Sequence, residues 1–185
     1  MEDRYGSILM NIILLGYRGT GKSVISRLLS KQLKRRLFSL DSMIEEAVGI
    51  PIPEIVSLWG WPRFREIESK IVERVTEEAR DSVIDCGGGV VLNSNNVKKL
   101  KQNGKAVLLT ASFETLLSRL SRDRNNRPRL KEGLSWEDEH RKLLAEREDK
   151  YNAAADLVCD TTNKRPDETV YEIIEYFKKH SWVEV

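Results

Sequence analysis

The chain has 185 residues, enough for a single domain whose core needs neither disulfides nor a structural metal. Its 31 basic and 29 acidic residues leave a net charge of +2, which excludes bulk electrostatic attraction to nucleic acid or to a membrane surface. No apolar run in the sequence is long enough to span a bilayer.

Short apolar runs alternate with longer amphipathic segments, the pattern of a parallel sheet covered by helices. The predicted strands are residues 11–15, 37–40, 83–85, 106–110 and 157–159. The predicted helices are residues 22–34, 42–48, 61–79, 95–103, 113–122, 136–154 and 167–180. This order predicts one three-layer α/β domain over residues 1–185, with a five-stranded parallel sheet flanked by helices. Ligands are expected beyond the carboxyl ends of the strands.

The first glycine-rich segment, GYRGTGKS from Gly16 to Ser23, fits the phosphate-loop pattern GxxxxGK[ST] in full. Its glycines let backbone N–H groups surround phosphate oxygens, Lys22 reaches the outer phosphates, and Ser23 offers a hydroxyl to Mg²⁺. The motif follows a predicted strand and opens a predicted helix, which is the context that supports it. The residues predicted to bind ATP here are Gly19, Thr20, Gly21, Lys22 and Ser23 of this segment and Val24, which follows it.

Phosphate loops serve several classes of protein, and the rest of the chain narrows the choice. A switch GTPase would carry an NKxD-type segment that reads guanine, and a motor would need a much longer chain; neither is present. Arginines and a second glycine run follow the later predicted strands, where an acceptor can lie beside the γ-phosphate. The sequence therefore favours a small kinase with the P-loop kinase fold.

Asp41 follows the second predicted strand and has two interpretations. Its carboxylate can accept a proton from an acceptor hydroxyl or orient that hydroxyl for in-line attack. It can also simply cap the helix predicted at residues 42–48. The run Gly87 to Gly89 after the third strand favours the first interpretation, because three successive glycines weaken regular structure but let a ligand approach the backbone.

Three arginines, Arg65, Arg127 and Arg147, would each be interpreted alone as a solvated surface charge. Their sequence contexts are FREIE, RPRL and EREDKY. Taken in order with GYRGTGKS, LDSMIEEAVGIPIPEI, DCGGGVV and the late TTNKRP, they resemble the shikimate kinase family of P-loop proteins. The resemblance covers nearly the whole chain.

The resemblance implies a role for each matching residue. Arg65 and Arg147 match the arginines that bind the substrate carboxylate, for which bidentate guanidinium pairing gives the physical reason. Asp41 and the run Gly87, Gly88 and Gly89 match the residues that meet the substrate hydroxyls. Arg127 matches a lid arginine that covers the phosphates. Asn163, Arg165 and Pro166 match a loop that borders the adenine, and either Arg119 or Arg122 is expected to stack on the base.

The chain departs from the family pattern after the second strand. The family usually has Asp-x-Asp there, and its first Asp helps to hold Mg²⁺ through water, whereas this chain reads Ser39-Leu40-Asp41. Asp85 ends the third predicted strand, in the place of a Walker B acid. Asp85 either caps a turn or takes over the Mg²⁺ role, since Mg²⁺ keeps most of its waters and needs only a nearby carboxylate. The second interpretation makes Ser23 and Asp85 the metal-site residues.

The resulting functional hypothesis is ATP-dependent phosphorylation of the 3-hydroxyl of shikimate, a step toward chorismate and the aromatic amino acids. Lys22, Arg127 and Asp41 are its catalytic residues, with Mg²⁺ as cofactor and ATP as cosubstrate. Residues 41–73 form the expected substrate-binding segment and residues 119–133 the lid. The alternatives are a gluconate- or nucleotide-kinase-like enzyme and a catalytically weak nucleotide-binding module, for which Ser39 is the only support.

Cysteine usage and the first residues indicate the compartment. Cys86 and Cys159 are far apart and lack metal-ligand spacing, so two reduced thiols are expected. The first ten residues carry acidic side chains and lack the apolar core and cleavage site of a secretory signal. These features predict a cytoplasmic monomer that binds shikimate and ATP but neither nucleic acid nor a membrane.

Overall fold

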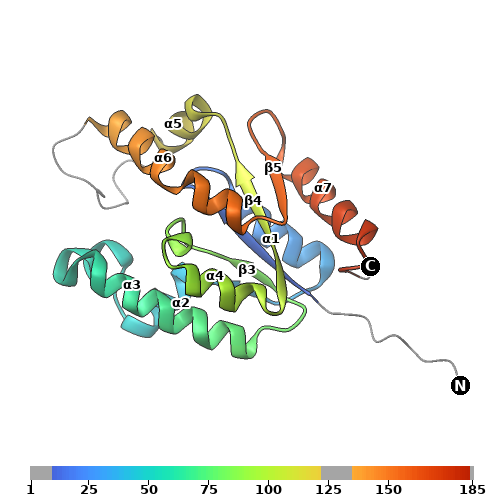
Figure 1. Ribbon diagram of the computed structural model, residues 1–185, viewed down its shortest axis with the longest axis horizontal. Helices are drawn as coiled ribbons and strands as arrows, with labels where there is room; N and C mark the ends of the chain where they lie inside the picture. The colour runs from blue at the N-terminus through green and yellow to red at the C-terminus, as the bar shows by residue number, and fades with distance from the viewer. Residues whose placement is uncertain (1–9, 122–134, 184–185) are drawn as a thin grey trace, which may run out of the picture.

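A computed structural model describes residues 10–121 and 135–183. Five parallel strands form its sheet, in the order β2-β3-β1-β4-β5 (Figure 1). The strands are β1 (Asn11–Gly16), β2 (Leu37–Ser39), β3 (Val83–Asp85), β4 (Gly104–Thr110) and β5 (Leu157–Asp160). Because β1 lies between β3 and β4, the loop after β1 opens at the point where the strand order reverses, which is where ligands bind in such sheets.

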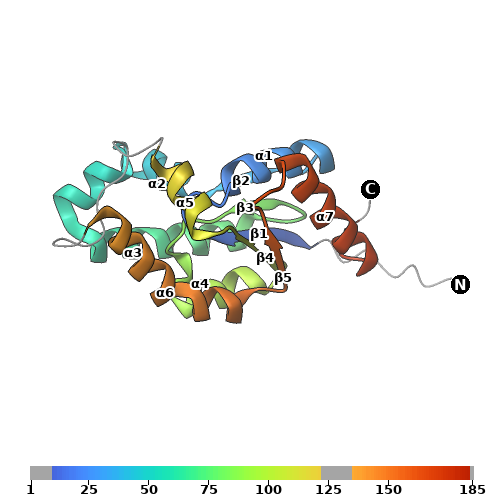
Figure 2. The same ribbon diagram turned by 90° about the horizontal axis from the view of Figure 1, so that it is seen from above.

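Helices cover both faces of the sheet, so the domain has the three layers expected (Figure 2). Helices α1 (Lys22–Leu33) and α7 (Pro166–Lys179) lie on one face, and α3 (Ile52–Glu78), α4 (Ser94–Lys101) and α6 (Trp136–Ala154) lie on the other. The other helices within the described residues are α2 (Leu40–Val48), the 3₁₀ turn η1 (Val90–Leu92) and α5 (Phe113–Ser121). None of the helices in the described part of the chain is long and apolar enough to span a membrane.

Strand β1 supplies side chains to two separate cores because successive residues of a strand point to opposite faces. Ile12 and Leu14 pack with the apolar side chains of α1 and α7. Ile13 and Leu15 pack with those of α3, α4 and α6. All four side chains are almost fully buried, as expected of a strand in the middle of a parallel sheet.

The sequence predicted every strand of the sheet, with several boundaries corrected: β1 and β5 each extend one residue further, and β4 begins two residues earlier. Leu40 does not belong to β2 but begins α2, because the Ser39 side chain caps that helix and accepts a hydrogen bond from the Ser42 N–H. Helix α3 is the larger correction, since it begins at Ile52 rather than at residue 61. Gly60 has a non-helical backbone inside it and Pro62 follows, so α3 is two helical segments joined at a kink. The turn η1 was not predicted.

Candidate active site

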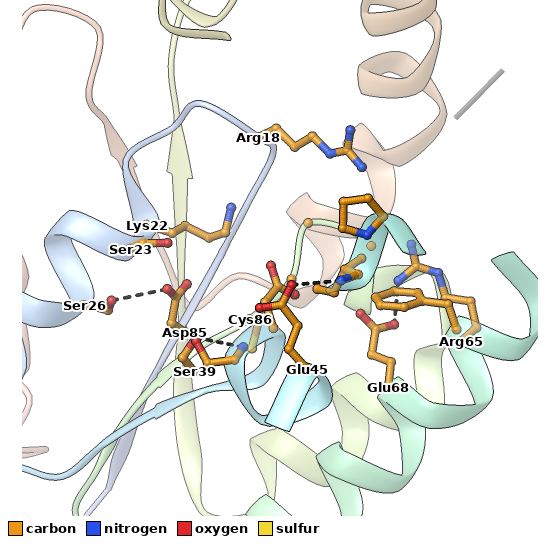
Figure 3. A pocket seen from close by; sticks show the side chains of 18 of the residues that line it. Arg18, Lys22, Ser23, Ser26, Ser39, Glu45, Arg65, Glu68, Asp85 and Cys86 are labelled. Carbon is orange, nitrogen blue, oxygen red and sulfur yellow. Dashed lines mark hydrogen bonds and ion pairs between the residues drawn. The ribbon is translucent and has the colours of Figure 1, made fainter. Parts of the chain in front are cut away.

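A pocket of about 510 Å³ lies at the carboxyl edge of the sheet, where the loops after β1, β2 and β3 meet α3 and α6 (Figure 3). It collects side chains that are far apart in the sequence. All eight residues predicted to bind substrate or metal line it, together with the loop lysine Lys22: Ser23, Asp41, Arg65, Asp85, Gly87, Gly88, Gly89 and Arg147.

The phosphate loop connects β1 directly to α1. Gly19 and Gly21 have φ angles of 82° and 94°, which side chains rarely adopt, so these two positions explain why the loop carries glycines. Lys22 begins α1, and its ammonium group donates to the carbonyls of Gly16, at 2.7 Å, and Tyr17, at 3.0 Å. The loop therefore holds its own lysine over the helix N-terminus, where an anion is favoured.

The loop between β5 and α7 lies against the phosphate loop. The Arg119 guanidinium donates to the Gly19 carbonyl at 3.1 Å and to the Thr161 carbonyl at 2.8 Å. The Thr161 hydroxyl donates to the Thr20 carbonyl at 3.1 Å. These bonds fix the loop that carries Asn163, Arg165 and Pro166 beside the phosphate loop. Arg122, Arg127 and most of the predicted lid lie outside the described residues.

Asp41 lies in the first turn of α2 and lines the pocket, with an exposed side chain. The interpretation of Asp41 as the helix cap is wrong, because Ser39 is the cap. The Asp41 carboxylate also lies close to the glycine run, since a Cβ added to Gly87 would stand 2.7 Å from its Oδ1. Glycine at that position leaves room for the carboxylate.

Asp85 ends β3 and lies directly opposite Ser39 on the neighbouring strand β2. Figure 3 shows its carboxylate between Ser39 and helix α1, where Ser26 Oγ lies 3.4 Å from Oδ2. Burial raises the pKa of Asp85, and Asp41 raises it further, while Lys22 and hydrogen bonding from Ser23 and Ser26 oppose the shift. A largely buried carboxylate beside the loop lysine and two hydroxyls is a fitting neighbour for a hard cation.

Arg65 lies across the pocket on α3, and its guanidinium pairs with Glu68 one turn later at 2.6 Å. Glu68 is 1% exposed, and its Oε1 has no hydrogen-bond partner among the described residues. Burial raises the pKa of Glu68, and the charge and hydrogen bond of Arg65 oppose that shift. A Cβ at Gly89 would stand 2.1 Å from the Arg65 guanidinium, so any other residue at this position would displace the end of the Arg65 side chain.

Helix α6 contributes Arg147 and Tyr151, which both donate to the Gly88 carbonyl. The Arg147 bond is 3.0 Å long, and the side chain of this arginine is almost fully buried, 4% of the residue being exposed. Arg147 and Arg65 thus approach the glycine run from α6 and α3. Two guanidinium groups at one end of a pocket are suited to a carboxylate.

Trp59 and Trp61 flank Gly60 in the sequence, but they line different pockets in the structure. Trp61 lines the pocket, and its ring lies 5.4 Å from the Arg65 guanidinium carbon and packs edge-on against Phe64. Trp59 is half exposed and lines a different, shallower groove. Neither Glu68 nor Tyr151 was predicted as an individual site residue, although Glu68 belongs to the segment FREIE and Tyr151 to the segment EREDKY.

The fold and the site together define a P-loop kinase for a small acceptor: a five-stranded parallel sheet, a phosphate loop at its reversal point, and an adjoining pocket with two arginines and an acid. Comparison with known proteins specifies the class further. The family model described as shikimate kinase matches residues 18–178. The chain belongs to the shikimate kinase family.

Individual relatives agree with the family match. The shikimate kinase of Pelotomaculum thermopropionicum is 37% identical over 176 residues, which covers 95% of this chain and all of that protein. The shikimate kinase of Geobacter metallireducens is 41% identical, covering 93% of this chain and 94% of its own. The solved structure of shikimate kinase from Acinetobacter baumannii in complex with shikimate has a TM-score of 0.87 at 30% identity, covering 94% of this chain and 96% of that one.

Proposed function

We propose that the protein transfers the γ-phosphoryl group of ATP to the 3-hydroxyl of shikimate. The observation that carries this proposal is the convergence of Arg65, Arg147 and Asp41 in one pocket that opens onto the phosphate loop. Shikimate offers a carboxylate for the two guanidinium groups and hydroxyls for the acid. Family membership and the similarity to a structure solved with shikimate support the same acceptor.

The residues divide between donor and acceptor. The phosphate loop and Val24 hold the triphosphate, with Asn163, Arg165 and Pro166 along the adenine. Lys22 and Arg127 balance the negative charge that spreads over the transferring group. Asp41 orients the acceptor hydroxyl and receives its proton, and the backbone of Gly87 to Gly89 meets the neighbouring hydroxyls. Little covalent chemistry is asked of the protein, because positioning and charge supply most of the rate in such transfers.

Mg²⁺ is the proposed cofactor, held by the Ser23 hydroxyl and, through water, by Asp85. When bound, it would neutralise negative charge on the phosphate groups. Asp85 suits this role because it ends the strand beside β2, so its carboxylate lies opposite Ser39, where the family usually has an acid. The acid that the family usually has at the end of β2 is thus replaced by one at the end of the neighbouring strand β3, at the same edge of the sheet.

The remaining proposals concern the molecule as a whole. Residues 1–185 form one kinase domain, a cytoplasmic monomer that binds small molecules and neither nucleic acid nor membranes. Segments 41–73 and 119–133 close over the acceptor and the phosphates, so that water does not take the phosphoryl group. A gluconate- or nucleotide-kinase activity is not favoured, because the relatives found over nearly the full length are shikimate kinases. A weak nucleotide-binding module is opposed by the complete acceptor pocket.

The test is ADP release by the purified protein with Mg·ATP, with and without shikimate. We expect release that depends on shikimate and falls at least about a hundredfold in Asp41→Asn, because an amide cannot accept the hydroxyl proton. Nucleotide binding by Asp41→Asn, measured by calorimetry with ADP, is expected to match that of the wild-type protein. Wild-type binding of ADP without shikimate-dependent turnover would contradict the proposal.

A further inference from the structure

Helix α6 contacts the phosphate loop through a buried pair of rings that the proposed chemistry does not use. Tyr17, the second residue of the loop, forms a hydrogen bond of 2.8 Å between its hydroxyl and Nδ1 of His140. The two side chains come from positions 123 residues apart, and only 2% of Tyr17 and 6% of His140 are exposed. A buried polar pair of this kind is costly to break, because each partner would lose its hydrogen bond without gaining water.

Both rings are held from other sides. The Trp136 ring packs edge-on against His140, with centroids 4.7 Å apart, and the Tyr17 and His140 rings meet nearly at a right angle. Burial lowers the pKa of His140, as does Arg18, while Glu139 opposes the shift. Burial raises the pKa of Tyr17 to about 12, against the charges of Arg147 and Arg18. A neutral imidazole and a protonated phenol can form this bond in either direction.

The Tyr17 ring also touches Arg147, whose guanidinium carbon lies 5.8 Å from the ring centroid. This contact adds to those that orient Arg147. The Arg147 guanidinium donates to the Gly88 carbonyl and interacts with the Tyr151 hydroxyl, while its Nε is buried without a hydrogen-bond partner among the described residues. A cation over an aromatic face at this distance is stabilised, more so when both groups are shielded from water.

The backbone of Tyr17, by contrast, is fixed without its ring. Its carbonyl accepts hydrogen bonds from the Thr20 hydroxyl at 2.9 Å and from the Lys22 ammonium group at 3.0 Å. Neither bond involves the phenol or His140. Losing the hydroxyl contact should therefore disturb the Tyr17 ring and Arg147 while the phosphate loop keeps its shape.

We propose that His140 and Tyr17 are positioning residues that hold Arg147 in the orientation needed to bind the acceptor carboxylate. The inference rests on the proposed function, because it assigns Arg147 to that carboxylate. His140 does not line the proposed acceptor pocket. It acts through the Tyr17 ring, which lies between His140 and the arginine.

The experiment compares Tyr17→Phe, His140→Leu and His140→Asn with the wild-type protein. In the first two variants we expect the KM for shikimate to rise about five- to tenfold, the effect of one lost hydrogen bond, with kcat changed less than twofold. The affinity for ADP, measured by calorimetry, should stay within twofold. His140→Asn restores a polar atom near the Nδ1 position and should recover most of the shikimate affinity.

Two controls separate this role from general destabilisation. His180→Leu removes the other histidine of the chain, which is exposed on the C-terminal side, and should leave both affinities unchanged. The double variant Tyr17→Phe/His140→Leu should be no weaker for shikimate than the worse single variant, because both changes break the same bond.

Each remaining outcome decides against the idea. A KM for shikimate that stays at the wild-type value in Tyr17→Phe and His140→Leu would overturn the positioning role while leaving the kinase assignment intact. An equal loss of ADP and shikimate affinity would show that the pair supports the whole loop instead. A wild-type protein with no shikimate-dependent turnover would overturn the proposed function and this inference with it.

Discussion

Some ionisable side chains of this site are buried, which costs free energy when they are charged, and Asp85 is the clearest case. It is 7% exposed, yet it lies within reach of the loop lysine and of hydroxyls on α1. At the end of a buried strand, a carboxylate without a cationic partner would lower the stability of the fold. Asp85 lies opposite Ser39, so the end of β3 carries an acid where the end of the neighbouring strand β2 lacks one.

Replacing this acid gives a prediction at the residue scale. We expect Asp85→Asn to raise the Mg²⁺ concentration needed for half-maximal turnover about 10- to 100-fold, the usual effect of losing an outer-sphere carboxylate. Calorimetry of ADP binding at increasing Mg²⁺ should show the same shift. Adding Ser39→Asp to Asp85→Asn returns a carboxylate to the opposite strand position, so it should restore much of the metal affinity.

The stability of Asp85→Asn can be predicted separately from its Mg²⁺ requirement. Because burial raises the pKa of Asp85 in the folded state, the folded protein binds a proton more readily there than the unfolded chain does. The ionised group therefore costs stability above its ordinary pKa of 3.8, and that cost disappears at lower pH. Without metal, Asp85→Asn should be at least as stable as wild type near pH 7. An unchanged Mg²⁺ requirement would refute the assignment.

At the scale of elements, the sequence predicted what depends on local pattern and missed what depends on contacts. Strands, the phosphate loop and α6 follow from apolar runs, glycines and helical spacing. Helix α3 was only half predicted, because Gly60 and Pro62 indicate a helix break, whereas the chain resumes its helix directly after the kink. No sequence pattern predicts that Tyr17 contacts His140. The roles of Arg65 and Arg147 were predicted from the resemblance to a family, because the spacing of these residues alone does not indicate them.

The kink itself leads to a prediction. Gly60 has φ 76° and ψ 169°, a region open almost only to glycine, and it separates the first segment of α3 from the segment that carries Arg65. Gly60→Ala should cost about 1–3 kcal/mol of stability or straighten the helix. Either response moves the two segments relative to each other, so we expect a higher KM for shikimate and an unchanged affinity for ADP.

Gly49→Ala is the matched control for this change. Gly49 ends α2 with φ 84°, and nothing lies within 4 Å of the position of its missing Cβ. Its substitution should also lower stability, by about 1–2 kcal/mol, without moving α3. Thermal unfolding and shikimate kinetics on both variants test the difference. The same KM in Gly60→Ala as in the wild-type protein would show that the kink does not set the acceptor pocket.

Across the whole molecule, the two ends of the sheet are built differently. The carboxyl end holds the pocket, with exposed acids and buried carboxylates of raised pKa. The amino end is closed by polar contacts that reach no ligand. Arg35 pairs with Asp81 there, and Asp156 accepts from both Lys101 and the Ala106 N–H, at 3.1 and 2.7 Å. Stability and chemistry are therefore expected to be separable by position along the strands.

Asn11, the first residue of β1, tests this separation. It is 2% exposed, and its side chain donates to the Ala79 carbonyl at 3.2 Å and accepts from the Ser82 N–H at 2.9 Å, joining the end of α3 to the start of β3. Asn11→Ala leaves a buried donor and a buried acceptor unsatisfied, so urea unfolding should show a loss of about 2–4 kcal/mol. The exposed Asn95 on α4 provides the control, and Asn95→Ala should change stability by less than about 0.5 kcal/mol.

Activity, in contrast to stability, should not change when the amino end of the sheet is altered. At a temperature well below its unfolding midpoint, Asn11→Ala is expected to keep its kcat and both KM values within twofold of wild type, because the strands still deliver the same side chains to the carboxyl edge. A change in shikimate KM without a loss of stability would mean that the amino end is coupled to the pocket through β1. The separation fails in that case, since β1 runs directly from Asn11 into the phosphate loop.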